Sequence, residues 1–132
     1  MTLNSLKSNL QTEIGGIWFD YPGTPIRLKI ARAGNIEFDK SFRKILKSSR
    51  VSIDSLETLD AIDLQKPVVA EHILKDWEGV IEDVGVVIKY TPEKGLEMFN
   101  NDEFYSFYKF VLKCSESSEK FAFIAEETIL GN

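Results

Sequence analysis

The residues of this chain that could carry out chemistry are few, and they do not form a known catalytic pattern. Cys114 is the only cysteine and His72 the only histidine. A nucleophilic thiol needs a neighbouring base and a lowered pKa, and no spacing in the sequence links these two residues. Cys114 is therefore expected to be a half-buried helix residue that packs as a small apolar group. A single cysteine also excludes a disulfide within the chain, which fits a reducing cytoplasm.

The acidic residues resemble a metal site only superficially. Glu78, Glu82 and Asp83 lie close together in the sequence, but a calcium loop needs further oxygen ligands and a glycine at a fixed position. The glycines form neither a G-x-G-x-x-G pattern nor a Walker loop, so nucleotide binding is not expected. Carboxylate pairs that could hydrolyse glycosides occur in any acid-rich chain and have no specificity. We therefore expect no metal, no cofactor and no enzymatic activity.

The size and composition of the chain indicate a single domain over residues 1–132. A chain of 132 residues, of which 43% are hydrophobic and 28% charged, can bury a core without a disulfide or a metal. No N-terminal segment has the pattern of a signal peptide, and no apolar run approaches the ~20 residues that span a bilayer. We therefore expect a soluble protein that is not exported.

The charge balance disfavours general binding to duplex nucleic acid. The net charge is -5, whereas phosphate contacts need concentrated Lys and Arg. One local basic cluster is nevertheless present, and such charge runs usually form a solvated helix face. The alternative is that this helix contacts nucleic acid, which would make the protein a small regulatory or host-directed binding module. The cluster comprises Arg43, Lys44, Lys47 and Arg50.

The N-terminal part of the chain predicts a β-hairpin. Residues 1–13 are polar and form either a flexible arm or a weak first helix. The aromatic segment I-W-F-D-Y and the alternating segment I-R-L-K-I-A-R flank a turn that contains Pro22, Gly23 and Pro25. Two such segments around a Pro/Gly turn are typical of a hairpin with one buried face. Because an isolated hairpin is barely stable in water, its apolar face must pack on helices or on another subunit.

The middle of the chain predicts mainly helices. A helix over 36–48 has one apolar face and is capped by Asn35. Residues 48–64 are expected to be a loop followed by a short helix or an extended piece. Pro67 is expected to open a further helix that reaches about Trp77.

The second half of the chain alternates a small β-rich loop with two helical regions. V-I-E-D-V-G-V-V-I-K-Y is expected to form a small hairpin or a strand-like loop that turns at Gly85. Thr91, Pro92 and Glu93 supply a hydroxyl cap, a proline at the first helical position and a first-turn acid, so a helix is predicted to begin there. A longer helical pattern begins at Asp102, and the S-E-S-S stretch is expected to divide it.

These elements define the expected fold class. We predict an α+β protein that is mostly α-helical. Its N-terminal β-hairpin should pack on a bundle of about four to five helices, because a sheet with one apolar face must bury that face against another layer.

Aromatic residues are the best candidates for a binding surface. Trp18 and Trp77 either pack in the core, as large apolar residues usually do, or line a groove. The rings between 104 and 110 cover most of a helix circumference, which is more than one core face can absorb, and aromatic residues are enriched in interfaces. The candidate surface for a partner or for self-association comprises Trp77, Phe104, Tyr105, Phe107 and Tyr108.

One stretch of the chain resembles a known family. Residues 70–111 contain A-E-H-I-L-K-D-W-E-G-V, then Gly85, then I-K-Y-T-P-E and an aromatic helix. Together they resemble the tail assembly chaperones of long-tailed bacteriophages and their prophage relatives. In that family a helix with W-x-G-V leads through an acidic, Gly-containing turn into a short apolar strand and a Thr-Pro-Glu helix start. The matching positions are Trp77, Gly79, Val80, Asp83, Gly85, Ile88, Tyr90, Thr91, Pro92, Glu93 and the segment 104–111.

This resemblance implies a non-enzymatic protein of the host bacterial cytoplasm that is absent from the mature virion. Such a chaperone self-associates and binds the tape measure protein, which it keeps soluble while the tail tube assembles. The resemblance also implies a longer form made by ribosomal frameshifting, through which the tail tube protein would be contacted. A homo-oligomer and the tape measure protein are thus the expected partners, whereas a membrane and nucleic acid are not.

Overall fold

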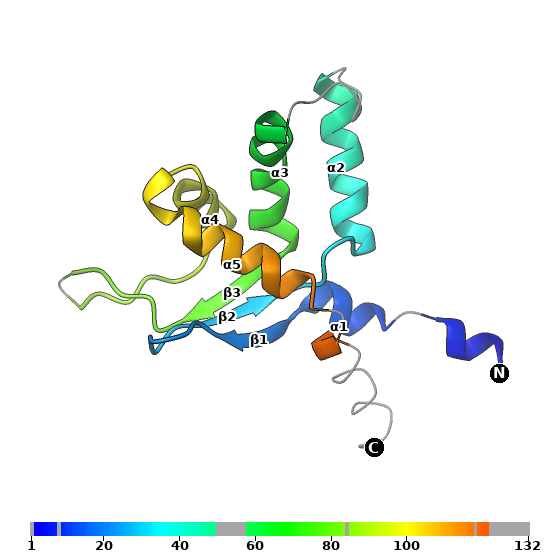
Figure 1. Cartoon of the computed structure of the whole chain (residues 1–132), viewed down its shortest axis with the longest axis horizontal. Helices are drawn as coiled ribbons and strands as arrows, with labels where there is room; N and C mark the ends of the chain where they lie inside the picture. Colours follow the sequence, from blue (N-terminus) through cyan, green and yellow to red (C-terminus); the bar gives the residue numbers. More distant parts are fainter. Residues whose placement is uncertain (1, 8, 50–57, 84, 118, 122–132) are drawn as a thin grey trace.

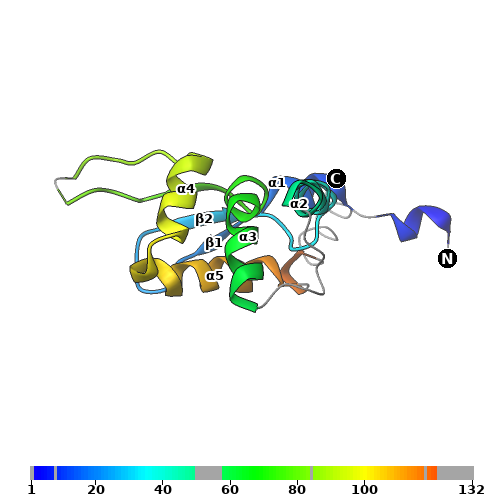
Figure 2. The same cartoon turned by 90° about the horizontal axis from the view of Figure 1, so that it is seen from above.

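The fold is that of a small sheet covered by helices, seen in a computed structural model that describes residues 2–7, 9–49, 58–83, 85–117 and 119–121. A three-stranded antiparallel sheet in the order β1-β2-β3 has the longer helices on one face (Figures 1 and 2). The predicted α+β class is therefore confirmed. None of the helices within these ranges combines the length and the apolar character that crossing a bilayer requires.

Strands β1 (Ile17–Asp20) and β2 (Arg27–Ile30) form the predicted N-terminal hairpin. Because side chains alternate between the two faces of a strand, every second residue points toward the helices. The apolar residues occupy these inward positions, and each is at most 8% exposed. They are Ile17, Phe19, Leu28 and Ile30.

The segment around Trp77 corrects one prediction. The helix expected from Pro67 to Trp77 instead begins earlier, as α3 (Thr58–His72), and contains Pro67. Trp77 lies on strand β3 (Leu74–Glu78), opposite Leu28 of β2. A two-stranded hairpin leaves the outer edge of β2 without hydrogen-bond partners, and L-K-D-W-E fills that edge. Long-range pairing therefore decides the conformation of this segment.

Helix α2 (Ile36–Ser49) forms where it was predicted. Asn35 caps it, since its Oδ1 accepts a hydrogen bond from the Phe38 amide at 3.0 Å. The Asn35 side-chain amide donates to the carbonyls of Arg32 and His72, at 2.8 and 3.3 Å. One buried asparagine thus joins the start of α2 to the end of α3. Of the region 48–64, residues 58–64 belong to α3, and the expectation for 50–57 lies outside the described residues.

The C-terminal helices also begin as predicted. Thr91 caps α4 (Pro92–Phe99) by accepting from the Lys94 amide at 3.1 Å. A short 3₁₀ turn, η3 (Asp102–Phe104), precedes α5 (Tyr105–Ser115). The expected division of this region is present, because α5 ends at Ser115.

Two further segments connect the elements. Residues 79–83 and 85–90 form the two sides of the expected hairpin-like loop, with an antiparallel bridge between Ile81 and Val87. The two sides project beyond the sheet in Figure 1. At the other end, η1 (Leu3–Leu6) and α1 (Leu10–Gly15) show that the N-terminal arm contains short helices. The part that contains η1 extends away from the body of the molecule (Figures 1 and 2).

The core lies between the sheet and helices α3, α4 and α5. Side chains from every one of these elements contribute to it, which makes the described body a single packed unit. Its apolar centre, with at most 2% exposure for each residue, includes Leu28, Ile30, Val69, Ile73, Leu74, Tyr108 and Val111.

Candidate functional site

The five aromatic residues predicted to form a binding surface divide between the core and the surface. Trp77 is 5% exposed and Tyr108 only 1%, so neither contributes an open face in this conformation. Trp77 is buried because it belongs to the inner row of the sheet, and Tyr108 because its ring packs 4.7 Å from that of Phe99. Phe107 is half-buried. Phe104 remains on the surface and so does Tyr105, which stays a predicted self-association residue.

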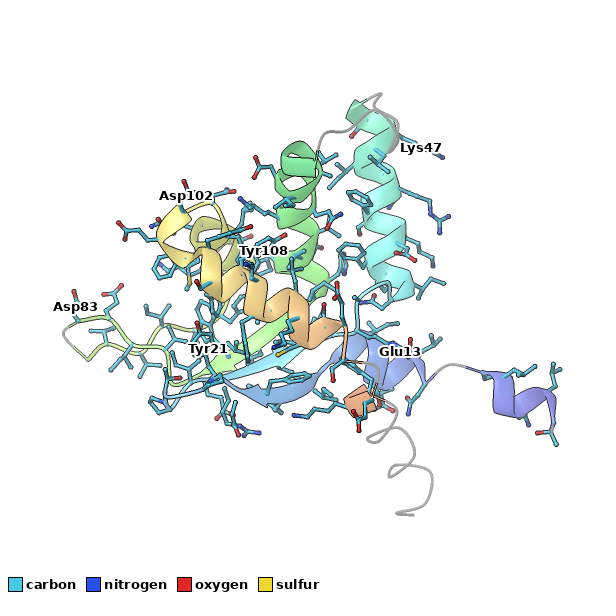
Figure 3. All side chains as sticks on the ribbon, in the orientation of Figure 1. Glu13, Tyr21, Lys47, Asp83, Asp102 and Tyr108 are labelled. Atoms are coloured by element: carbon cyan, nitrogen blue, oxygen red, sulfur yellow. The ribbon has the colours of Figure 1, made fainter. Side chains whose placement is uncertain are left out.

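An apolar pocket of about 470 Å³, which we call the main pocket, lies among the described residues. Pockets that bind ligands or anchor side chains commonly enclose about 300–1,000 Å³. This one lies where the β1–β2 turn, the base of the 79–90 loop and the η3–α5 junction meet. Tyr21, one of its lining residues, is labelled in Figure 3. Its walls comprise Tyr21, Pro25, Ile26, Trp77, Gly79, Val80, Ile81, Met98, Phe104 and Phe107.

The turn between β1 and β2 forms the floor of the pocket. The Tyr21 amide donates to the Ile26 carbonyl at 2.9 Å, which closes the turn. The Tyr21 ring lies 4.9 Å from that of Phe110, edge to face, and 5.9 Å from that of Phe107. Such aromatic pairs add stability beyond area burial. The floor is therefore fixed to α5 by ring packing.

The base of the 79–90 loop forms one wall of the pocket. Trp77 Nε1 donates to the Ile88 carbonyl at 2.7 Å, so the returning side of the loop is tied to strand β3. Gly79 has a φ of +80°, and a Cβ there would lie 2.8 Å from the Pro25 carbonyl oxygen. Only glycine allows both the backbone conformation and this close approach. The loop is therefore held directly against the floor.

Tyr90 anchors the end of the same loop to the core. Its ring packs edge to face on Trp77, 4.8 Å between centroids, and its hydroxyl donates to the Ala70 carbonyl of α3. Burial, followed by the nearby Glu93 carboxylate, raises the pKa of Tyr90 well above its ordinary value. The hydroxyl therefore stays protonated and able to donate.

Helix α4 and the η3–α5 junction form another wall of the pocket. Met98, Phe104 and Phe107 face the pocket, and the Phe107 ring lies 6.0 Å from that of Phe99 in the core. Methionine adapts its shape to irregular partners. A smaller pocket of about 250 Å³ adjoins this wall and shares Val80, Ile81, Met98 and Phe104 with the first. We call the two pockets together the apolar groove.

The groove lies in the most acidic part of the chain. Residues 76–103 contain eight acidic and two basic residues, which gives this segment a charge of -6 against -5 for the whole chain. Glu82 lines the smaller pocket. Figure 3 labels Asp83 on the 79–90 loop and Asp102 at the start of η3. The main pocket is thus apolar, whereas the smaller pocket is also lined by Glu82, Lys94, Glu97 and Asn101. Acidic residues outnumber basic ones around the groove.

The groups that could do chemistry lie elsewhere and are engaged in structure. His72 Nε2 is 2.8 Å from Ser41 Oγ, a contact between α3 and α2. Burial raises the pKa of the Cys114 thiol to about 11, although Lys120 and Lys113 oppose the shift. Among the residues that the structure describes, no three His, Cys, Asp or Glu side chains form a group that could hold a metal ion.

The basic cluster lies apart from the groove. Arg43, Lys44 and Lys47 are exposed on α2, and Figure 3 labels Lys47 at the far end of the molecule from Tyr21. Arg50 lies outside the described residues. Exposure of this kind is what a solvated helix face requires, and it is equally what a phosphate contact would use.

Sequence reasoning found one side of the groove and missed the other. Trp77, Phe104 and Phe107 were among the predicted residues, but Tyr21, Ile26 and Met98 were not. The missed residues come from a turn and a helix that are distant in sequence, and the pairing of β2 with β3 brings the turn to Trp77. The Pro-rich turn and W-x-G-V were both visible signals, but nothing in their spacing indicated that they touch.

Comparison with known protein families gives the class of the chain. The family model described as YdaY prophage protein matches residues 34–132. The chain therefore belongs to the YdaY prophage protein family, and its origin is a prophage. The match begins just before α2 and so includes Trp77, the 79–90 loop and α5, but not the β1–β2 hairpin. Neither the curated proteins nor the solved structures gave a match.

Proposed function

We propose that this prophage protein is a non-enzymatic tail assembly chaperone whose apolar groove holds a helical segment of the tape measure protein. The observation that carries the proposal is the uncovered groove itself. Exposed apolar surface costs free energy in water, and contiguous apolar patches on a protein surface usually mark interaction sites. The main pocket within the groove is lined by side chains from the β1–β2 turn, β3, the 79–90 loop, α4, η3 and α5.

The resemblance to tail assembly chaperones supports the proposal at the groove. Trp77, Gly79 and Val80, which belong to the segment that resembles the family, line the main pocket. The resemblance is imperfect, because W-x-G-V begins on strand β3 here and not on a helix. The prophage origin supports a role in virion assembly, because a prophage encodes the components of a virion.

Self-association is the second part of the proposal. Tyr105 is 51% exposed beside the groove, and Leu3 and Leu6 of the N-terminal arm are 78% and 69% exposed. These apolar side chains are available to other copies of the chain. A chaperone that coats a long helical partner needs contacts between its copies as well as contacts with the partner.

Co-expression tests the proposal. The chain is produced together with the long, predicted-helical polypeptide encoded downstream in the prophage, followed by affinity purification and light scattering. We expect a soluble complex that contains many copies of the chaperone for each partner. A partner that stays insoluble while this chain elutes alone contradicts the proposal.

A matched pair of variants then locates the contact. Ile81 lines the groove and its bridge partner Val87 does not, yet both are exposed, at 59% and 71%. Ile81→Ser should abolish recovery of the partner, and Val87→Ser should leave it unchanged. Equal recovery with both variants would mean that the groove is not the site. Salt-dependent binding of the chain to DNA would then favour the basic face of α2.

A further inference from the structure

The acidic residues around the groove are arranged on two sides of it. Glu82 and Asp83 lie on the 79–90 loop, and Asp102 and Glu103 lie in η3 directly before Phe104. Ile81, which precedes Glu82, and Phe104, which follows Glu103, line both pockets. Carboxylates therefore stand next to the apolar wall on both of these elements.

Within the part of the chain that the structure describes, these four carboxylates form no salt bridge. By contrast, Glu78 of β3 pairs with Arg27 at 3.3 Å, and in the lining of the smaller pocket Glu97 pairs with Lys94 at 3.5 Å. Among the described residues, no Lys, Arg or His lies within salt-bridge distance of Glu82, Asp83, Asp102 or Glu103. Like charges gathered around an apolar surface repel one another and any acidic partner, and they attract a basic one.

We infer that the partner segment recognised by the groove is a basic amphipathic helix. Its apolar residues, at spacings of three and four, would contact Ile81, Met98 and Phe104. Lys and Arg residues beside that apolar stripe would pair with the carboxylates of the loop and of η3. This inference rests on the proposed function and specifies the chemistry of the partner. Helix-in-groove recognition of this kind uses an apolar stripe for affinity and charges for selection.

The charge of the rest of the chain supports this choice of partner. Residues 76–103 have a charge of -6, so the remainder of the chain has a charge of +1. The negative charge of this protein is therefore concentrated where the groove is. Complementary charge also accelerates encounter with a partner, an effect that falls as salt rises.

Three synthetic helical peptides test the inference. All have the same apolar stripe, and they differ only in the flanking residues, which are Lys/Arg, Gln or Glu. Binding to the full chain is measured by calorimetry at low and at high salt. The basic peptide should bind about tenfold more tightly than the neutral one at low salt, and the acidic peptide most weakly. High salt should reduce the differences.

A matched pair of double variants assigns the effect to the groove. Glu82→Gln with Glu103→Gln removes two charges next to the groove. Glu116→Gln with Glu119→Gln removes two exposed charges after α5, outside the residues that line the groove. The first variant should lose most of the preference for the basic peptide, and the second should retain it. Equal loss in both would mean that only the net charge matters, which overturns the inference.

The outcomes separate this inference from the proposed function. If the three peptides bind equally and Ile81→Ser abolishes binding, the groove is the site but its partner is not selected by charge. If no peptide binds and Ile81→Ser has no effect on recovery of the tape measure protein, both proposals fail. If peptides bind only after Leu3→Ser and Leu6→Ser, the arm of another copy fills the groove, and the inference is wrong.

Discussion

The core and the exposed surface of this protein use the same helix in opposite ways. Tyr105 and Tyr108 lie on α5, three positions apart, yet Tyr105 is 51% exposed and Tyr108 is 1% exposed. Because an α-helix has about 3.6 residues per turn, two side chains three positions apart are separated by slightly less than one full turn around the helix axis. In this chain the small difference separates the interior from the surface. Dense aromatic sequence therefore does not by itself distinguish a core from an interface.

Trp77 belongs to both the core and the groove. Its position opposite Leu28 places it in the sheet, while its edge forms part of the groove wall. A change there should affect both stability and binding, whereas changes on either side of it should affect one of them. Variants ordered from the largest expected effect to the smallest can test this division.

Trp77→Ala should have the largest effect. Removal of a buried tryptophan leaves a cavity and costs about 3–5 kcal/mol of unfolding free energy. Chemical denaturation followed by circular dichroism measures it. Trp18→Ala, on the outer face of the sheet, is the control and should cost clearly less because Trp18 is only partly buried. Equal costs would show that the sheet has two buried faces.

Gly79→Ala should be the next largest. Both Gly79 and Gly85 have a φ near +80°, which costs a residue with a Cβ about 1–2 kcal/mol. Only Gly79 also meets the Pro25 carbonyl, whereas Gly85 faces open space. Gly79→Ala should therefore destabilise the protein by at least about 1 kcal/mol more than Gly85→Ala. If thermal melting shows the same loss for both, the loop is not held against the β1–β2 turn.

Phe104→Ala should separate binding from stability. Phe104 is 39% exposed and lines both pockets, so its removal should cost about 1 kcal/mol or less in stability, as surface substitutions usually do. Affinity for the partner segment should fall about tenfold or more, since aromatic anchors dominate interfaces. Tyr105→Ala should weaken self-association, measured by sedimentation, without changing the melt. A large loss of stability in either variant would move that ring into the core.

Tyr108→Phe should have a small effect of opposite sign. Among the described residues Tyr108 Oη is buried without a hydrogen-bond partner. A buried unsatisfied hydroxyl costs free energy, so its removal should leave the stability unchanged or raise it by up to about 1 kcal/mol. A loss of stability would reveal a hydrogen bond to that hydroxyl.

Comparison of Tyr108→Phe with the natural chain also tests how the folding stability depends on pH. Burial, and then the charges of Asp63 and Tyr105, raise the pKa of Tyr108 from 10.0 to about 12. The folded state therefore holds this proton more tightly than the unfolded state does. This contribution to stability is complete below pH 10 and is lost as the pH rises to about 12. Denaturation in this range should be less steep with pH for Tyr108→Phe than for the natural chain.

The sequence predicted the elements whose signals are local. Three such elements are the Pro/Gly turn between β1 and β2, the Asn35 cap and the Thr91-Pro92-Glu93 helix start. Each of them depends on residues that lie only a few positions apart. Each was confirmed, because capping and turn chemistry act over a few residues.

The features that were not predicted depend on contacts between segments that are distant in the sequence. Strand β3 exists because β2 offers it a partner edge, and the groove exists because β3 brings the 79–90 loop to the β1–β2 turn. Proline 67 was a misleading local signal, since it begins helices more often than it lies within them. Here it is exposed inside α3. Long-range pairing overrode the local preference.

The hydrogen bond between the Trp77 indole and Ile88 gives the protein an optical reporter at the groove. The chain has two tryptophans, Trp77 in the groove wall and Trp18 on the outer face of the sheet, with the Arg27 guanidinium 5.2 Å from its ring. Indole fluorescence responds to nearby water. When the groove is filled, the emission of Trp77 should change, whereas Trp18, on the other face of the sheet, should contribute a constant background. Occupancy of the groove is thus visible without any label.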